Sequence, residues 1–96
     1  EMILRGGENI SPLEIEEALL AHPAIEEAVA FGVPDEKYGE TVAAAVSLKS
    51  EASEEEILAH SRERLAAFKV PGAVHVLDHM VVGHNKSVFA YYKARA

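Results

Sequence analysis

The chain has 96 residues, of which 49% are hydrophobic and 26% charged, with a formal net charge of −7 and no cysteine. This length suffices for one small domain but is too short to combine a deep substrate pocket with a nucleotide site, so an enzyme built on it is expected to need more chain. The acidic balance argues against a general binder of nucleic acid or anionic membranes, and the missing cysteines exclude disulfides, thiol catalysis and cysteine-based metal sites.

No apolar run approaches the roughly 20 residues that a membrane-spanning helix needs. The N-terminus also lacks the basic region and hydrophobic stretch of a signal peptide. The first residue is Glu1 rather than Met, so we expect a piece of something longer, with the missing part upstream. A cytoplasmic location is expected, with which the absence of cysteine is compatible.

A short apolar opening at residues 2–4 leads into a turn with two adjacent glycines. Ser11 and Glu14 then form the Ser-x-x-Glu pattern of a capping box, in which each side chain accepts a hydrogen bond from the other residue's backbone N–H. Pro12 suits the first helical position. Apolar residues recur at helical spacing until Pro23, which predicts an amphipathic helix of about three turns.

Two strands are expected next, over residues 25–33 and 41–48, joined by a loop with Pro34, Asp35 and Gly39. The short connection predicts an antiparallel pair. The first strand alternates large and small side chains: Val29, Phe31 and Val33 against Ala28, Ala30 and Gly32. The small face allows a helix to pack closely on this strand.

A second helix is predicted from Ser53 to about Ala67. Ser53 and Glu56 repeat the capping-box pattern, and three glutamates stand at the positive end of the helix dipole. These glutamates are interpreted as a solvated helix start, because general acid catalysis needs a carboxyl that faces a substrate.

A third short strand is expected over residues 73–77, an irregular loop over 79–86 and a last helix from about Ser87. Together the elements predict an α+β domain. Its sheet is expected to be short, mostly antiparallel and three-stranded, packed by three helices.

Three segments stand in the order and spacing of a known family over residues 2–78: GGENISPLEIE, HPAIEEAVAFGVPDEKYGETVAAAVSLK and LAAFKVP. They resemble the C-terminal domain of the AMP-forming acyl-CoA synthetases, in the adenylate-forming superfamily that also includes firefly luciferase and nonribosomal adenylation domains. The first segment resembles the CoA ligase branch. Nonribosomal adenylation domains usually carry an Arg-x-Glu-Leu-Gly-Glu-Ile-Glu pattern after the first glycine.

The resemblance implies a two-step ligase. A carboxylate attacks the α-phosphorus of ATP to give an acyl-adenylate and pyrophosphate, and the thiol of CoA then displaces AMP. It also implies that a large N-terminal domain, absent from this chain, holds ATP, Mg²⁺ and the acyl group, while residues 1–96 form a C-terminal lid. The lid would swing between two poses, one offering a lysine to adenylation and one presenting the glycine turn to the pantetheine arm of CoA.

The resemblance places four residues near CoA. Gly6 and Gly7 would line the pantetheine channel, because glycine lets a thin chain approach the backbone and pair with its N–H and C=O groups. Lys69 would lie near the CoA phosphates or pack against the partner domain, and Arg5 is a similar peripheral residue. The residues alone leave open a simple turn for the glycines and a structural corner, fixed by Pro71, for Lys69.

Lys86 is interpreted as the adenylation lysine, because it stands where the family has a Pro-Lys-Thr-x-x-Gly-Lys-like loop before the final helix. An ammonium delivered by a closing lid stabilises the charge that builds on the phosphoryl oxygens. The loop departs from the family pattern, with Met80 in the place of the proline and Asn85 in that of the glycine. Lys49 and Lys93 are alternatives that lack this position.

Two other groups of residues are interpreted as structural. Gly39 is expected to serve a turn, and Glu40 to bond nearby backbone N–H groups. His75, His79 and His84 are not expected to bind a metal, because a strand would hold the first two well apart. His22 and His60 are read as helix-surface residues.

Two functions follow from these observations. The first is the lid of an acyl-CoA ligase for a fatty or other carboxylic acid, working with its N-terminal domain, ATP, Mg²⁺ and CoA, and inactive as an isolated fragment. The second is a non-catalytic interaction module that keeps the lid fold, which the departures around Lys86 favour. The acid itself is not predicted, because the acyl pocket would belong to the missing domain.

Overall fold

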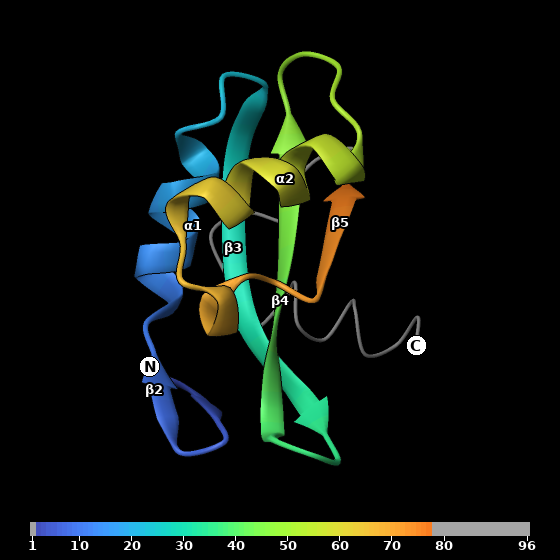
Figure 1. Cartoon of the computed structure of the whole chain (residues 1–96). Coiled ribbons are helices and arrows are strands. Elements are labelled where there is room, and N and C mark those ends of the chain that lie inside the picture. The colour runs from blue at the N-terminus through green and yellow to red at the C-terminus, as the bar shows by residue number, and fades with distance from the viewer. Residues whose placement is uncertain (1, 78–96) are drawn as a thin grey trace.

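Residues 2–77 are described by a computed structural model, in which they form one five-stranded sheet and two α-helices (Figure 1). The elements in chain order are β1 (Ile3–Arg5), β2 (Glu8–Ile10), α1 (Pro12–Leu20), β3 (Ile25–Asp35), β4 (Gly39–Leu48), α2 (Glu54–Arg64), the 3₁₀-helix η1 (Ala67–Lys69) and β5 (Ala73–Leu77). The α+β class and the mostly antiparallel sheet are confirmed, whereas the prediction of three strands is wrong. The predicted loop 79–86 and the third helix from Ser87 lie outside the described residues. Neither described helix is long and apolar enough to cross a membrane.

The opening stretch is a β-hairpin rather than an apolar segment and a turn. β1 and β2 pair antiparallel, with Ile3 opposite Ile10 and Arg5 opposite Glu8. The two glycines between them form the turn. Strands of three residues are too short to show an alternating pattern, which is why the sequence did not predict this hairpin as two strands.

β4 pairs with three of the other four strands. One edge pairs antiparallel with β3 along nearly its whole length, as the short connection predicted. The other edge pairs in parallel with β5 over Ala43–Ser47, and at its beginning Gly39 lies opposite Arg5 of β1. The strand order is therefore β2-β1-β4-β3, with β5 also beside β4.

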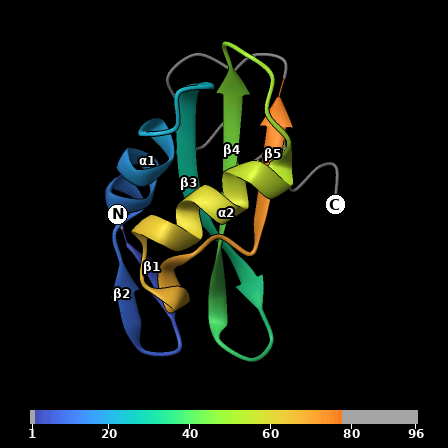
Figure 2. The same cartoon turned by 45° about the horizontal axis from the view of Figure 1, so that its top comes forward.

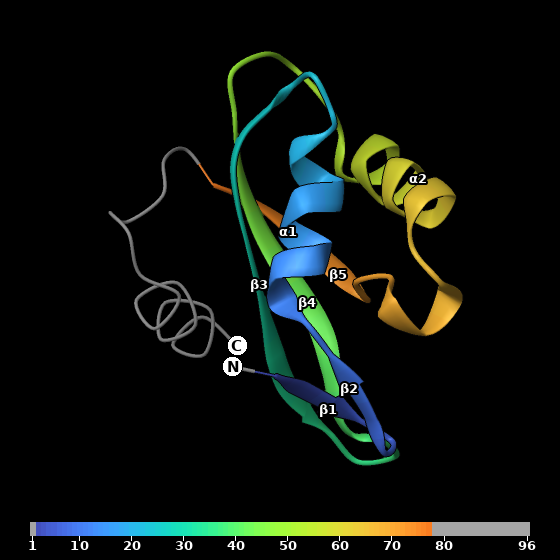
Figure 3. The same ribbon diagram turned by 90° about the vertical axis from the view of Figure 1, so that its left-hand side faces the viewer.

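Both α-helices lie on the same face of the sheet (Figure 3), which is the face of small residues in β3. Ala30 is buried there in one cluster with Ile15 of α1 and Ile57 of α2. Val29 and Phe31 belong to a second cluster, together with two alanines of β4. The predicted alternation is thus confirmed. Since an alanine side chain ends at Cβ, the helices can pack close to the strands.

β3 is an outer strand of the described sheet, and this position explains how it contains Pro34. Alternate residues of an outer antiparallel strand point their N–H groups away from the neighbouring strand. The outward N–H of Ala30 donates to Glu16 Oε2 of α1 at 2.9 Å. Pro34 stands in the same register and has no N–H. The strand therefore continues to Asp35, beyond the predicted end at Val33.

α2 begins with the predicted capping box and crosses in front of β3 and β4 in the view of Figure 2. The Glu56 N–H donates to Ser53 Oγ at 3.1 Å, and the Ser53 N–H donates to Glu56 Oε1 at 2.8 Å. The backbone bond from Ser53, followed by the Ser53 side chain, lowers the pKa of the Glu56 carboxyl, because both stabilise its charged form. The helix ends at Arg64 rather than near Ala67, since Leu65 turns to extended backbone and is buried.

The capping box predicted at the start of α1 does not form. Ser11 has the extended backbone of an N-cap residue, but its side chain makes no capping hydrogen bond. Glu14, which would complete the box, instead pairs with Lys69, whose Nζ lies 2.9 Å from Glu14 Oε1. Glu14 thus bonds Lys69, which is 55 residues away in the sequence, in place of the backbone N–H of Ser11.

The two helix starts give a matched test. Ser53→Ala removes an acceptor that is in use, so it is expected to lower the free energy of unfolding by about 1 kcal/mol. This loss corresponds to a melting temperature about 4–8 °C lower in thermal unfolding followed by circular dichroism. Ser11→Ala is the control and should change the melting temperature much less. Equal losses for the two variants would contradict the difference between the two starts.

Candidate functional site

The glycine turn has a backbone that favours glycine at both positions. Gly6 has φ 58° and Gly7 has φ 88°, the combination that a type I′ hairpin turn requires. A Cβ added to Gly6 would lie 3.2 Å from Cδ1 of Tyr38, whereas one added to Gly7 would have no other heavy atom within 4 Å. The turn therefore rests against Tyr38 on one side and has open space at Gly7.

Tyr38 holds the turn from the tip of the β3–β4 hairpin. The Gly6 N–H donates to the Tyr38 carbonyl at 2.8 Å. The Arg5 guanidinium carbon lies 3.9 Å from the centroid of the Tyr38 ring, and Lys37 Nζ lies 5.3 Å from it. Both distances are within the range of a cation–π interaction. Lys37 and Tyr38 were not predicted from the sequence, although the Lys-Tyr pair directly precedes Gly39, which was predicted to serve a turn.

Gly39 and Glu40 form the scaffold that was predicted for them. Gly39 has φ 83°, and the Leu4 N–H donates to Glu40 Oε1 at 2.8 Å. Asp35 Oδ2 closes the hairpin tip by accepting from the N–H groups of Lys37 and Tyr38 at 3.0 and 2.8 Å. The two hairpins are thus bonded to each other through Leu4, before the glycine turn, and through Gly6, within it.

Lys69 lies at the end of η1 and is held by α1. Its Nζ lies 2.9 and 3.1 Å from the two carboxylate oxygens of Glu14, and the side chains are 24% and 47% exposed. Pro71 is buried and Val70 is half-buried against the core, which confirms the structural corner. The corner fixes the backbone that carries the Lys69 ammonium.

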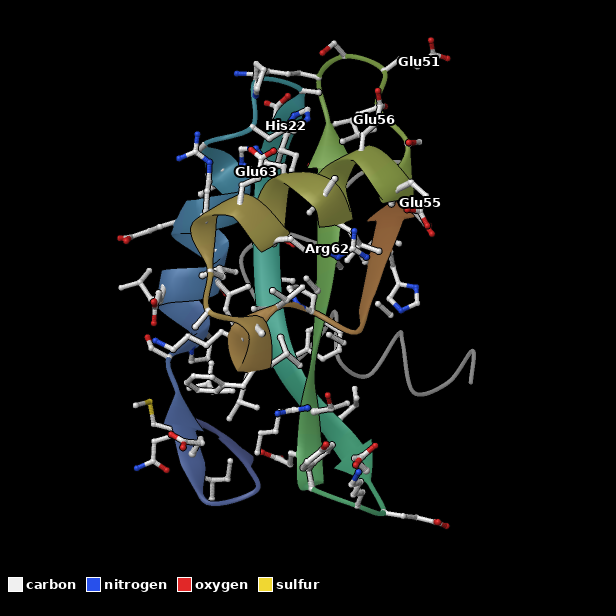
Figure 4. The ribbon with its side chains drawn as sticks, viewed as in Figure 1. His22, Glu51, Glu55, Glu56, Arg62 and Glu63 are labelled. Atoms are coloured by element: carbon white, nitrogen blue, oxygen red, sulfur yellow. The ribbon has the colours of Figure 1, made fainter. Side chains whose placement is uncertain are left out.

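Charged side chains lie at both ends of the described structure. Figure 4 shows Glu51, Glu55 and Glu56 around the start of α2, at the end away from the glycine turn. The three glutamates of the first turn of α2 are all exposed, in agreement with a solvated helix start. Arg5 and Lys37 lie at the glycine turn, where Glu8, Asp35 and Glu40 lie as well.

His22 and His60 are half-buried and connect the two α-helices, so their interpretation as simple surface residues is wrong. Their ring centroids are 5.0 Å apart in an edge-on arrangement. His60 Nε2 lies 2.9 Å from the Ala18 carbonyl oxygen, and His22 Nδ1 accepts from the Ala24 N–H at 3.0 Å. Both histidines therefore have structural bonds.

Within residues 2–77 no group of three or more His, Cys, Asp or Glu side chains is placed to hold a metal ion. His79, His84 and Lys86 lie outside the described residues. Of the predicted site residues, the structure brings Arg5, Gly6 and Gly7 together around Tyr38 and places Lys69 against Glu14.

The fold defines a small α+β domain whose glycine hairpin is fixed to the sheet. The AMP-binding enzyme C-terminal domain family matches residues 14–85. The chain belongs to this family.

Solved and curated proteins with CoA-ligase names are similar to this chain. The oxalate–CoA ligase of Arabidopsis thaliana is 50% identical over 82 residues, which cover 83% of this chain and 16% of the ligase. The o-succinylbenzoate CoA synthetase from Bacillus subtilis, in complex with the acyl-adenylate intermediate OSB-AMP, has a TM-score of 0.79 at 41% identity, covering 83% of this chain and 16% of that one. The same synthetase has also been solved in complex with ATP and magnesium ion, with a TM-score of 0.76 at 40% identity and the same coverage of both chains.

The Mycobacterium tuberculosis fatty acyl CoA synthetase has a TM-score of 0.87 at 36% identity, covering 98% of this chain and 20% of that one. The chain thus spans between 16% and 20% of the length of these relatives.

Alanine at the turn tests its geometry. Gly6→Ala and Gly7→Ala are each expected to lower the free energy of unfolding by about 1–2 kcal/mol, because an alanine at positive φ is strained. Gly6→Ala should cost more than Gly7→Ala, since its Cβ also meets Tyr38. Urea denaturation measures both.

Gly72→Ala is the control, because its Cβ would make an ordinary contact of 3.7 Å at a residue without positive φ. It should leave the stability unchanged or slightly increased. Wild-type stability in Gly6→Ala would show that the turn does not have this backbone.

Proposed function

We propose that this chain is the C-terminal domain of an AMP-forming acyl-CoA ligase, which converts a carboxylic acid, ATP and CoA to acyl-CoA, AMP and pyrophosphate. The observation that carries the proposal is the glycine turn, which is open at Gly7 and anchored at Gly6 in a chain of this family. Relatives named as CoA ligases or synthetases support it, and the small share of their length that the chain covers supports a large N-terminal partner domain.

The glycine turn is proposed to line the path of the pantetheine arm. The arm is thin and carries amides, so it suits a backbone that no side chain covers. Gly7 offers such a backbone, because no heavy atom lies within 4 Å of its Cβ direction. The bonds from Gly6 to Tyr38 and from Leu4 to Glu40 hold the turn in place before CoA arrives, which reduces the ordering cost of binding.

Arg5 and Lys69 are proposed to meet the phosphate-bearing end of CoA. The Arg5 guanidinium carbon lies 3.9 Å from the Tyr38 ring centroid beside the turn, and a guanidinium carries five N–H donors. Lys69 comes from the separate corner after α2. Cations at two separate places of the domain suit a molecule with a neutral arm and an anionic end.

Lys86 is proposed to serve the adenylation step. In one pose of the lid its ammonium would stabilise the negative charge that develops on the α-phosphate of ATP as the carboxylate attacks. In the other pose the glycine turn would replace it near the adenylate. ATP and Mg²⁺ are assigned mainly to the N-terminal domain. We place the ligase in the cytoplasm, where ATP and CoA are both present.

The choice of acid is assigned to the N-terminal domain. The names of the similar proteins refer to oxalate, o-succinylbenzoate and fatty acyl groups. One small domain resembles the corresponding part of all of them. A surface shared by enzymes for such different acids is suited to ATP and CoA chemistry, which they have in common.

A non-catalytic interaction module is the second candidate. Met80 and Asn85 favour it, because they replace the proline and glycine of the family's lysine loop. The module would keep the hairpins and lose adenylation. The two candidates differ in what the lysine does, which a kinetic measurement on the full-length protein decides.

Replacing the lysine tests the first step. In the full-length ligase, Lys86→Ala is expected to slow acid-dependent pyrophosphate release by about 100-fold or more, the usual loss when one charge-stabilising donor is removed. Thioester formation from supplied acyl-adenylate should continue. Lys49→Ala is the comparison and should keep wild-type adenylation. Unchanged pyrophosphate release in Lys86→Ala would sink the assignment of this lysine, and its absence in the wild type would favour the module.

Filling the open side of the turn tests the second step. Gly7→Leu directs a bulky side chain into the space proposed for pantetheine, so acyl-CoA formation should slow by at least tenfold while pyrophosphate release remains. Retained adenylation shows that the domain still folds and docks. Gly72→Ala serves again as the control. Normal acyl-CoA formation by Gly7→Leu would remove the turn from the pantetheine path.

A further inference from the structure

Glu14 forms an ion pair with Lys69, the cation proposed to bind the phosphate-bearing end of CoA. Both carboxylate oxygens of Glu14 lie within 3.1 Å of Lys69 Nζ. An ammonium held in this way has fewer donors left for a phosphate, since it carries only three. A phosphate that binds Lys69 must therefore displace Glu14 or share the lysine with it.

We infer that Glu14 is a positioning residue that alternates between two partners, Lys69 when the CoA phosphate is absent and the backbone N–H of Ser11 when a phosphate has taken the lysine. The inference rests on the proposed function and concerns regulation of the same site.

The second partner comes from the sequence itself. Ser11 and Glu14 have the spacing of a capping box, and Ser11 already has the extended backbone of an N-cap residue. The same pair of residue types forms a complete box at Ser53 and Glu56. Only the Glu14 side chain has to move, so the exchange leaves the helix backbone in place.

The exchange is also favourable electrostatically in both states. The Lys69–Glu14 pair is partly exposed, and solvent screening makes such pairs weak. A phosphate brings more negative charge and more acceptor oxygens than a carboxylate, so it competes well for the ammonium. The released Glu14 remains in the first turn of α1, where the helix dipole stabilises a carboxylate.

The backbone of Lys69 is fixed while its side chain exchanges partners. The Lys69 N–H donates to the Ala66 carbonyl at 2.9 Å, and the next corner is tied to β4 by the Gly72 N–H, which donates to the Val42 carbonyl at 2.9 Å. Glu14 thus acts by holding Lys69 in position and lowering its availability. The carboxylate itself need not touch CoA.

Glu14→Gln in the full-length ligase tests the inference. Glutamine keeps the shape and still completes a capping box, but it has no charge for Lys69. The KM for CoA, and the Kd of CoA measured by calorimetry on enzyme loaded with a non-reactive acyl-adenylate analogue, should fall about two- to fivefold, as expected for loss of a weak competing ion pair. The KM for ATP and the rate of pyrophosphate release should stay unchanged. Glu17→Gln removes the same charge from the same helix and should change none of these values.

Two further variants separate competition from a structural role. Lys69→Ala should raise the Kd of CoA, and adding Glu14→Gln to it should have no further effect, because the lysine through which Glu14 acts is gone. Ser11→Ala should leave the Kd of CoA unchanged, since it keeps the backbone N–H that receives the released carboxylate and removes a side chain that makes no capping bond. If Glu14 had only a structural role, Glu14→Gln would lower the melting temperature and would not change the Kd of CoA through Lys69.

Titration with dephospho-CoA locates the phosphate. If Glu14→Gln no longer tightens binding when dephospho-CoA is used, Lys69 binds the 3′-phosphate. If the tighter binding persists, Lys69 binds the diphosphate. Both results support the exchange. An unchanged Kd of CoA in Glu14→Gln overturns it, whether or not Lys69→Ala has an effect. In either case a wild-type enzyme that forms acyl-CoA leaves the proposed function standing, and one that forms none shows that the function itself has failed.

Discussion

β4 is hydrogen-bonded along both edges and buried on both faces, and the site depends on this strand. Residues 42–46 are each no more than 2% exposed, because helices cover one face and a second apolar cluster lies on the other. The same strand begins at Gly39, opposite Arg5. Glu40, one residue further, accepts from Leu4. The hairpin that carries the glycine turn is therefore attached to β4 through Gly39 and Glu40, the first two residues of this buried strand.

Local patterns allowed much of the fold to be predicted. The alternation of Val29 and Phe31 with small residues has period two, and it gave the two faces of β3 correctly. Ser53 and Glu56 gave the start of α2 because both partners of each hydrogen bond lie within four residues. A pattern confined to one strand or one helical turn is read from the chain without knowledge of its neighbours.

The features that were not predicted from the sequence depend on contacts between residues that lie far apart in the chain. Ser11 and Glu14 have the same spacing as the second box, yet Lys69 takes the glutamate. The glycines were recognised through a family resemblance, but their anchoring by Tyr38 was not predicted, because it joins two hairpins 32 residues apart in the sequence. The role of Lys86 also stays a prediction, since the residue lies outside the described part of the chain.

The outer edge of β3 affects the tendency of the domain to aggregate. A free strand edge can recruit a strand from another molecule and begin aggregation. Here the Ala30 N–H is already bonded to Glu16, and Pro34 has none to offer. An incoming strand would find no continuous row of donors along this edge. This edge is therefore a poor template for a strand from a second copy of the chain.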